Sequence, residues 1–300
     1  MAAISGHLTV SKDRACSNPV AHSQKQAIFG SEVKLREIEK TQLSFSASFR
    51  RTPNLKLMAS GKKAPVITQE AKAETGKKAD MFDEMKQHFL MFKKHKYMEN
   101  LEHFKNLSDA QFPKFLVIAC ADSRVCPSTI LGFQPGEAFT VRNIANLVPP
   151  YESGPSETKA ALEFSVNFLN VENILVIGHS RCGGIRALMS MDDEADSSSF
   201  IQNWVIVGKR ARASTKTVAS DLHFDHQCQH CEKESVNCSL QNLLSYPWIE
   251  ERVKKGLLSI HGGYYDFVDC KFEKWTLDYR GSTTGEEGKG ITIKDWSVWC

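Results

Sequence analysis

Long hydrophobic runs are missing from this sequence. No apolar stretch approaches the roughly 18 residues that a membrane-spanning helix needs, so the sequence predicts no membrane span. The N-terminal region also lacks the apolar core of a secretory signal. The nine cysteines stand at irregular spacing, which argues against a disulfide scaffold. The chain therefore fits a reducing compartment, in which thiols are free to bind metal.

Acidic residues are scarce at the start of the chain. Asp13 is the only one among the first 30 residues, and residues 1–59 hold eight serines and nine Lys or Arg against four Asp or Glu. This composition is typical of an import leader, so we expect residues 1–59 to be a disordered transit peptide. The chloroplast stroma is the expected destination, with the mitochondrion or the cytosol as alternatives. An ordinary disordered tail is the alternative for the segment itself.

A surplus of basic charge is absent beyond the leader. Residues 81–300 carry 24 Lys or Arg against 28 Asp or Glu, so no nucleic-acid partner is predicted. Residues 60–79 are small, polar and Lys-rich, which indicates a linker. The chain has no internal repeat. We expect one domain over 80–280, including an N-terminal helix, and a tail over 281–300.

The hydrophobic pattern predicts alternating strands and helices. Short apolar, β-branched runs predict strands over 114–119, 138–143, 174–178, 257–267 and 271–279. Helical periodicity predicts helices over 79–100, 156–170, 204–216 and 239–256, with Asp80 and Ser156 as caps of the first two. This alternation implies right-handed crossovers. The predicted fold is therefore α/β, with a mostly parallel central sheet of about five strands, the last antiparallel, flanked by helices.

The segment "IGHSRCGG" (177–184) follows a predicted buried strand. Three interpretations are open for it: a nucleophile elbow, a metal site, or a packed turn without chemistry. Gly178 and Ser180 fit the G-x-S-x-G elbow of α/β hydrolases, but Cys182 stands where the second glycine belongs. A side chain there crowds the tight turn. His261 and Asp266 also follow in the wrong order for that fold.

The metal interpretation requires a further ligand, and "CADSR" (120–124) supplies it. Cys120 ends one predicted strand as His179 ends another, and ligands collect at the carboxyl ends of strands that flank a switch point. Two cysteines and one histidine, with Cys182 as the third ligand, suit zinc and leave a fourth position open. Asp122 and Arg124 are placed to form a bidentate ion pair beside this set.

"CADSRVCP" and "GHSRCGG", together with "VRNIAN" (141–146), "HCEKESVN" (230–237), "NLLSYP" (242–247) and "GGYYDF" (262–267), resemble the β-class carbonic anhydrases, and their plant branch most closely. The resemblance implies reversible hydration of carbon dioxide to bicarbonate and a proton. It implies one Zn²⁺ per chain on Cys120, His179 and Cys182, beside an Asp122–Arg124 dyad. It also implies a homodimer as the catalytic unit, or a higher oligomer, with pocket residues partly from the partner subunit: Gln111, Phe139, Ile144, Phe164 and Gly183.

The sequence departs from the plant pattern in two places. Phe164 and Phe168 stand where tyrosine and histidine are usual, which leaves the proton relay unassigned, and the tail after Tyr279 diverges. "HQCQHC" (226–231) raises a second metal site as an alternative to ordinary structure. Two rival functions also stay open: a non-catalytic zinc or bicarbonate sensor, and a hydrolase that acts through Ser180 or Cys126.

Overall fold

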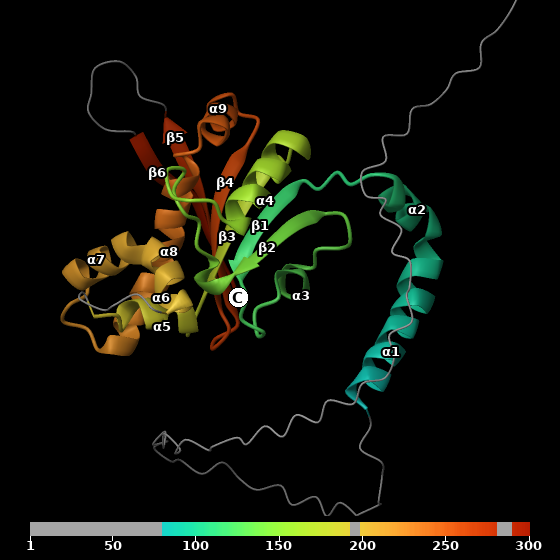
Figure 1. Cartoon of the computed structure of the whole chain (residues 1–300), viewed down its shortest axis with the longest axis horizontal. Helices are drawn as coiled ribbons and strands as arrows, with labels where there is room; N and C mark the ends of the chain where they lie inside the picture. The colour runs from blue at the N-terminus through green and yellow to red at the C-terminus, as the bar shows by residue number, and fades with distance from the viewer. Residues whose placement is uncertain (1–79, 193–198, 281–289) are drawn as a thin grey trace, which may run out of the picture. The chain divides into compact units, whose positions relative to one another are not determined.

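The computed structural model describes residues 80–192, 199–280 and 290–300. The predicted leader (1–59), the predicted linker (60–79) and the first part of the tail (281–289) lie outside the described residues. Within the described part, the chain forms one mixed sheet with helices packed on it (Figure 1). No helix in this part is long and apolar enough to cross a membrane.

The sheet has six strands within the described ranges, in the order β2-β1-β3-β4-β5-β6. Their bounds are β1 Phe115–Cys120, β2 Ala138–Asn143, β3 Asn173–His179, β4 Ser259–Asp266, β5 Lys271–Arg280 and β6 Gly290–Trp299. The first four strands are parallel, and β5 and β6 are antiparallel. The predicted α/β class with a mostly parallel sheet is confirmed.

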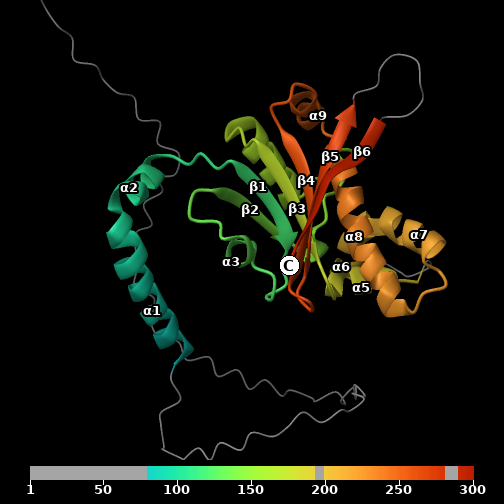
Figure 2. The ribbon, with the colours of Figure 1, turned by 180° about the vertical axis from the view of Figure 1, so that it is seen from behind.

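One strand was missing from the sequence prediction. β6 lies in the predicted tail and pairs with β5 at the edge of the sheet (Figure 2). Its register shifts near Asp295, whose φ of 52° marks a bulge. Trp296 of β6 stacks on Trp275, with ring centroids 4.9 Å apart, and Trp299 stacks on Phe272. The sheet therefore continues past residue 280, where the sequence prediction ended the domain.

The helices follow the predicted periodicity with several interruptions. The α-helices are α1 Met81–Phe92, α2 Leu101–Asp109, α3 Pro127–Leu131, α4 Glu157–Glu163, α5 Gly183–Met189, α6 Phe200–Val205, α7 Lys209–Val218, α8 Phe224–Leu243 and α9 Pro247–Lys254. Asp80 and Ser156 cap α1 and α4 as predicted. The predicted helix over 239–256 is instead the end of α8, a turn and α9, because Pro247 lacks an N–H and is suited to the first position of a new helix.

Alternate residues of the central strands face different layers. Leu116 and Ile118 of β1 pack with Leu162 of α4 and Leu240 of α8 in one core cluster. Val117 and Ala119 belong to a second cluster, on the face that the short helix α3 covers. β1 and β3 run side by side, whereas the chain leaves β1 for β2 on its other side. This reversal is the switch point at which polar side chains gather.

Candidate metal centre

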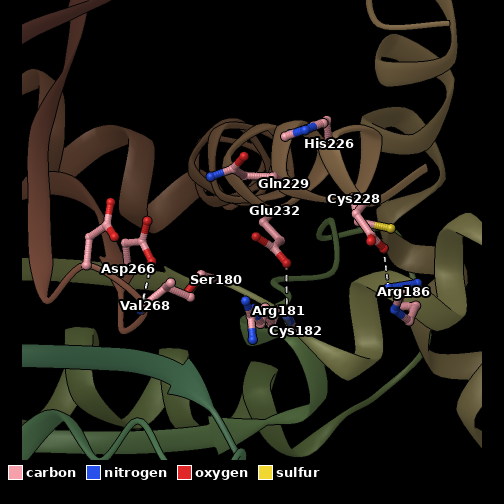
Figure 3. A pocket seen from close by; sticks show the side chains of 12 residues that line it. Ser180, Arg181, Cys182, Arg186, His226, Cys228, Gln229, Glu232, Asp266 and Val268 are labelled. Carbon is pink, nitrogen blue, oxygen red and sulfur yellow. Dashed lines mark hydrogen bonds and ion pairs between the residues drawn. The ribbon is translucent and has the colours of Figure 1, made fainter. Parts of the chain in front are cut away.

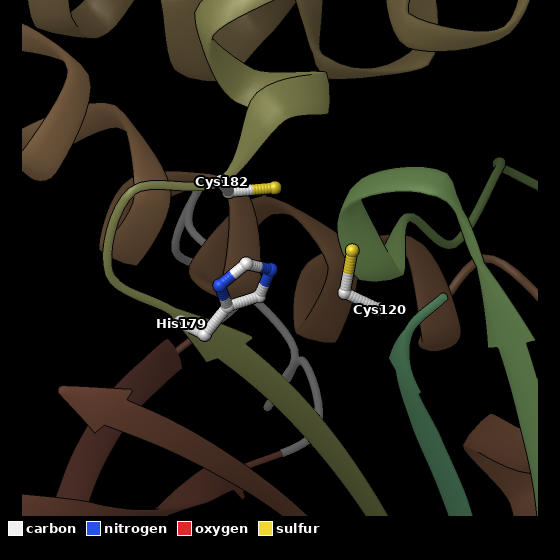
Figure 4. A group of neighbouring side chains, drawn as sticks. All are labelled: Cys120, His179 and Cys182. Atoms are coloured by element: carbon white, nitrogen blue, oxygen red, sulfur yellow. The ribbon is translucent and has the colours of Figure 1, made fainter. Parts of the chain in front are cut away.

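Three potential metal ligands converge at the carboxyl ends of β1 and β3 (Figure 4). Cys120 is the last residue of β1, His179 is the last residue of β3, and Cys182 lies on the turn that leads into α5. Their ligand atoms all lie within 4.8 Å of one another, and all three residues are buried. In the described residues, this is the only place where three or more such ligands converge.

The imidazole of His179 is oriented by the backbone. Its Nδ1 lies 2.9 Å from the carbonyl oxygen of Ser180, so Nδ1 carries the proton and donates it. The other nitrogen, Nε2, is then a lone-pair acceptor, and it is buried without a hydrogen-bond partner among the described residues. A buried polar atom of this kind is rare in a folded protein. An unprotonated Nε2 beside two cysteine sulfurs fits a metal ligand.

The thiols of Cys120 and Cys182 shift each other's pKa in opposite directions. A hydrogen bond with Cys182 lowers the pKa of the Cys120 thiol, against the effect of burial. The same hydrogen bond, together with burial, raises the pKa of the Cys182 thiol. Burial alone would lower the pKa of His179, but the negative charge of the neighbouring Cys120 thiolate raises it. One thiolate is thus favoured even without a metal, and thiolates are the form that binds zinc.

Asp122 is held by Arg124 through three hydrogen bonds. Asp122 Oδ1 accepts from the backbone N–H and the Nε–H of Arg124, both at 2.9 Å, and Oδ2 accepts from Nη2 at 2.7 Å. The pKa of Asp122 is held well below its ordinary range, chiefly by this bond to the guanidinium. The guanidinium also lies 4.4 Å from the ring centroid of Phe267. The carboxylate is therefore ionised and fixed two residues past Cys120.

Two of the pocket residues expected from the resemblance lie at this end of the sheet. Ile144 directly follows β2, whose last residue pairs with Cys120, and Gly183 begins α5 directly after Cys182. The neighbouring Gly184 packs so closely that an added Cβ would lie 2.7 Å from Cγ2 of Ile144. The segment that follows β2 and the start of α5 are thus in direct contact beside the cluster.

The other three expected pocket residues lie elsewhere in this chain. Gln111 precedes β1, and Phe139 pairs with Leu116, four residues before Cys120. At about 3.3 Å per residue, Phe139 is roughly 13 Å along the strand from Cys120. Phe164 packs on Phe139, with ring centroids 5.7 Å apart, and is partly exposed. Within one chain, these three residues are therefore separated from the Cys–His–Cys cluster.

The elbow and second-metal alternatives find no matching geometry. The Oγ of the buried Ser180 accepts the backbone N–H of Phe267 at 3.1 Å. His261 is hydrogen-bonded to Thr276 and Asn173 instead. The "HQCQHC" segment lies on α8, where the spacing of 100° per residue puts its two histidines and its two cysteines on opposite sides. Burial also raises the pKa of the Cys231 thiol to about 12, which favours the neutral form.

Two residues that support the cluster were not identified from the sequence. Arg142 of β2 donates to the carbonyl oxygens of Cys120 and Asp122, and so fixes the end of β1. Glu232 of α8 is buried and accepts the backbone N–H of Cys182 at 2.9 Å. Both belong to segments that carried the resemblance, but nothing in the local pattern indicated that either would reach the cluster.

A cavity of about 610 Å³ opens behind the Cys182 turn (Figure 3). It lies between the first half of α8, residues 180–182 and the turn between β4 and β5. Charged side chains line much of it, including Arg181, Arg186, Asp225, Glu232 and Asp266. Water can therefore approach the side of the Cys182 turn that faces away from β1.

The fold and the site define an α/β protein with a buried Cys–His–Cys cluster at the switch point of a parallel sheet. The model of the carbonic anhydrase family matches residues 115–272, more than half of the chain. This chain belongs to that family, in its β class and plant branch, and it is a carbonic anhydrase.

Named relatives and solved structures agree with this assignment. Beta carbonic anhydrase 5, chloroplastic, of Arabidopsis thaliana is 67% identical over 304 residues and covers all of both chains. Beta carbonic anhydrase 6, mitochondrial, of the same plant is 52% identical over 227 residues, 75% of this chain and 77% of the relative. The structure of the β-carbonic anhydrase CcaA has a TM-score of 0.61 at 27% identity, over 65% of this chain and 87% of that one.

Proposed function

We propose that this carbonic anhydrase hydrates carbon dioxide reversibly to bicarbonate and a proton, with one Zn²⁺ held by Cys120, His179 and Cys182. The observation that carries the proposal is the buried His179 Nε2, which has no hydrogen-bond partner among the described residues and belongs to a cluster with two sulfurs. Two soft thiolates and one borderline imidazole suit zinc. When bound there, zinc supplies the Lewis acidity that makes water a nucleophile near neutral pH.

The roles of the neighbouring side chains follow from their geometry. Oδ2 of Asp122 accepts one hydrogen bond from Arg124 and keeps a lone pair. That lone pair accepts the hydrogen of the attacking water and orients its oxygen toward carbon dioxide. Arg124 holds the carboxylate in place and away from the metal. Ile144 and Gly183 form the wall of the substrate site on this chain.

The catalytic unit that we propose is a homodimer. Gln111, Phe139 and Phe164 lie far from the cluster of their own chain, so a second copy is needed to bring these side chains to a metal centre. α1 presents Phe82, Met85 and Phe89 to solvent, each more than 60% exposed, which favours a partner for this helix. The solved structures of two β-carbonic anhydrases from Sordaria macrospora, 28% identical to this chain, are tetrameric.

We assign the chain to the chloroplast stroma. Its similarity to the chloroplastic relative extends over the full length and so includes the basic, Ser-rich leader. The division of the chain that we propose is a transit peptide over 1–59, a linker over 60–79 and a catalytic domain that begins at residue 80 and includes β6 of the predicted tail. Family membership favours an active enzyme over a zinc or bicarbonate sensor.

The decisive experiment measures zinc content and carbon dioxide hydration by stopped flow on the same samples. Cys182→Ser should lose both, because an alcohol stays protonated at pH 7 and is a poor zinc ligand. Ser180→Ala should keep both, since the hydroxyl only accepts the N–H of Phe267. A zinc-replete and active Cys182→Ser protein would refute the ligand assignment, and an inactive but zinc-replete Ser180→Ala protein would revive the hydrolase interpretation.

A further inference from the structure

The turn that carries Cys182 has an unfavourable backbone conformation. Arg181 has a φ of 53°, in the left-handed region that residues with a side chain rarely adopt. Such a conformation persists only where the surroundings hold it. One side of the turn borders the cavity of about 610 Å³, so packing does not confine it there. The position of Cys182 therefore depends on the hydrogen bonds that anchor residues 180–182.

Besides the hydrogen bonds of Ser180 with His179 and Phe267, three further hydrogen bonds hold this turn. The N–H of Ser180 donates to the carbonyl oxygen of Tyr265 at 3.0 Å, and Arg124 reaches the carbonyl oxygen of Arg181 at 3.4 Å. The third anchor is the bond from the N–H of Cys182 to Oε1 of Glu232 at 2.9 Å. It is the only one of the three that acts on the ligand residue itself.

Glu232 is itself fixed from two sides. Its Oε2 accepts the hydroxyl of Tyr264, a fully buried residue of β4, at 2.8 Å. Helix α8 lies directly against β3, because a Cβ on Gly178 would be 2.8 Å from Cγ2 of Val236 and 3.3 Å from the carbonyl oxygen of Glu232. The carboxylate thus connects α8, β4 and the Cys182 turn.

Stability alone does not explain a carboxyl group at this position. Glu232 is 3% exposed, and within the described part of the chain no Lys, Arg or His forms an ion pair with it. Burying an acidic group without a cationic partner is unfavourable.

We propose that Glu232 is a positioning residue for Cys182, which holds its sulfur in the geometry that binds the metal. The inference rests on the proposed zinc site. Without the acceptor at Oε1, the turn relaxes toward the cavity, and Cys182 Sγ moves away from Cys120 and His179. Partners outside the ligand set typically contribute 10- to 100-fold to metal affinity.

The test is the rate at which the full-length, zinc-loaded chain releases zinc to an excess of a chromophoric chelator. Glu232→Ala should release zinc about 10- to 100-fold faster than the parent. Glu232→Gln keeps an oxygen acceptor for the N–H of Cys182, although a neutral and weaker one, so its release should be only about three- to tenfold faster. Glu234→Ala, on the same helix but without contact to the turn, is the matched control and should release zinc at the parent rate.

The outcomes distinguish the proposed zinc site from the proposed role of Glu232. A parent chain without zinc would overturn the proposed metal site, and the role of Glu232 with it. A zinc-loaded parent with an unchanged rate in folded Glu232→Ala would overturn the positioning role alone. If Glu232→Ala does not fold, Glu232→Gln decides, and a rate within about twofold of the parent is then the refuting result. In Co²⁺-loaded protein, the thiolate charge-transfer band should shift in the Glu232 variants but not in Glu234→Ala.

Discussion

Arg124→Ala tests whether the orientation of Asp122 limits the reaction. The substitution removes the two side-chain hydrogen bonds to Asp122, from Nε to Oδ1 and from Nη2 to Oδ2, and the long one from Nη2 to the carbonyl oxygen of Arg181. It leaves the backbone N–H bond to Oδ1 of Asp122. One oxygen of Asp122 therefore stays tethered, and the carboxyl group becomes free to rotate about it. It could then swing toward the cluster of Cys120, His179 and Cys182, where it would compete with water for a bound zinc.

The expected loss follows from the size of this movement. A misplacement of about 1 Å near a reacting centre can cost roughly 10²-fold in rate, and rotation of an untethered carboxylate exceeds that distance. We therefore expect kcat/KM for carbon dioxide hydration to fall about 100-fold. The zinc content should stay at that of the parent, because Arg124 is not a proposed ligand and the N–H of Cys182 keeps its hydrogen bond to Glu232. Arg124→Lys should recover little, since an ammonium group cannot form the two parallel bonds of the guanidinium.

The assay is stopped-flow hydration of carbon dioxide, with metal analysis of the same protein. An Arg124→Ala enzyme that keeps more than about a third of the parent activity would refute the orienting role. A variant that loses zinc in proportion to its activity would also refute it, because the metal rather than the carboxylate would then account for the loss.

Three further predictions concern packing, pH and proton release. Gly184→Ala should lower the free energy of unfolding, measured in urea, by about 1–3 kcal/mol, because the new Cβ would lie 2.7 Å from Cγ2 of Ile144. Gly183→Ala should leave it unchanged, because a Cβ there has no atom within 4 Å. Equal effects of the two substitutions would contradict the packing argument. Burial lowers the pKa of His261 to about 4 from 6.5, so the unfolded chain binds a proton between these pH values that the folded chain does not. The free energy of unfolding should therefore fall as the pH drops from 6.5 to 4, by less than about 3 kcal/mol because the ring is partly exposed. His261→Gln should weaken this dependence of the free energy on pH, measured by urea unfolding. An unchanged dependence would exclude His261 as its source. Phe164 and Phe168 cannot transfer a proton, so the maximal hydration rate should rise with the concentration of an imidazole buffer. Phe164→Tyr should weaken that dependence. A fast rate that does not change with buffer concentration would indicate that another residue relays the proton.

Local sequence patterns were sufficient for the central strands. The runs that predicted β1, β2 and β3 match the observed strands to within a residue at each boundary. β1 and β3 are buried along nearly their whole length, and such strands have continuous, β-branched apolar runs. Caps are equally local, and Asp80 and Ser156 were identified from a polar side chain that precedes an amphipathic run. The ligand set was also readable, since Cys120 and His179 end strands that a parallel sheet must bring to one edge.

Local patterns were not sufficient where a contact joins distant segments. β6 carries charged and exposed residues and a bulge, so its strand character depends on pairing with β5 and on the stack of Trp296 on Trp275. The helix prediction over 239–256 joined two elements, because apolar residues continue across the turn before Pro247.

The sequence by itself determined the α/β class, the edge of the sheet that holds the site and the identity of the cluster residues, because each depends on short-range periodicity or on the ends of strands. Only the tertiary structure decided which side chains support the cluster. Glu232 is 50 residues from Cys182 in the chain, and the bond between them exists only because α8 packs against β3. The distance of Phe139 and Phe164 from the metal centre was likewise decided by the register of β2 against β1, which sets how far along the strands their side chains lie.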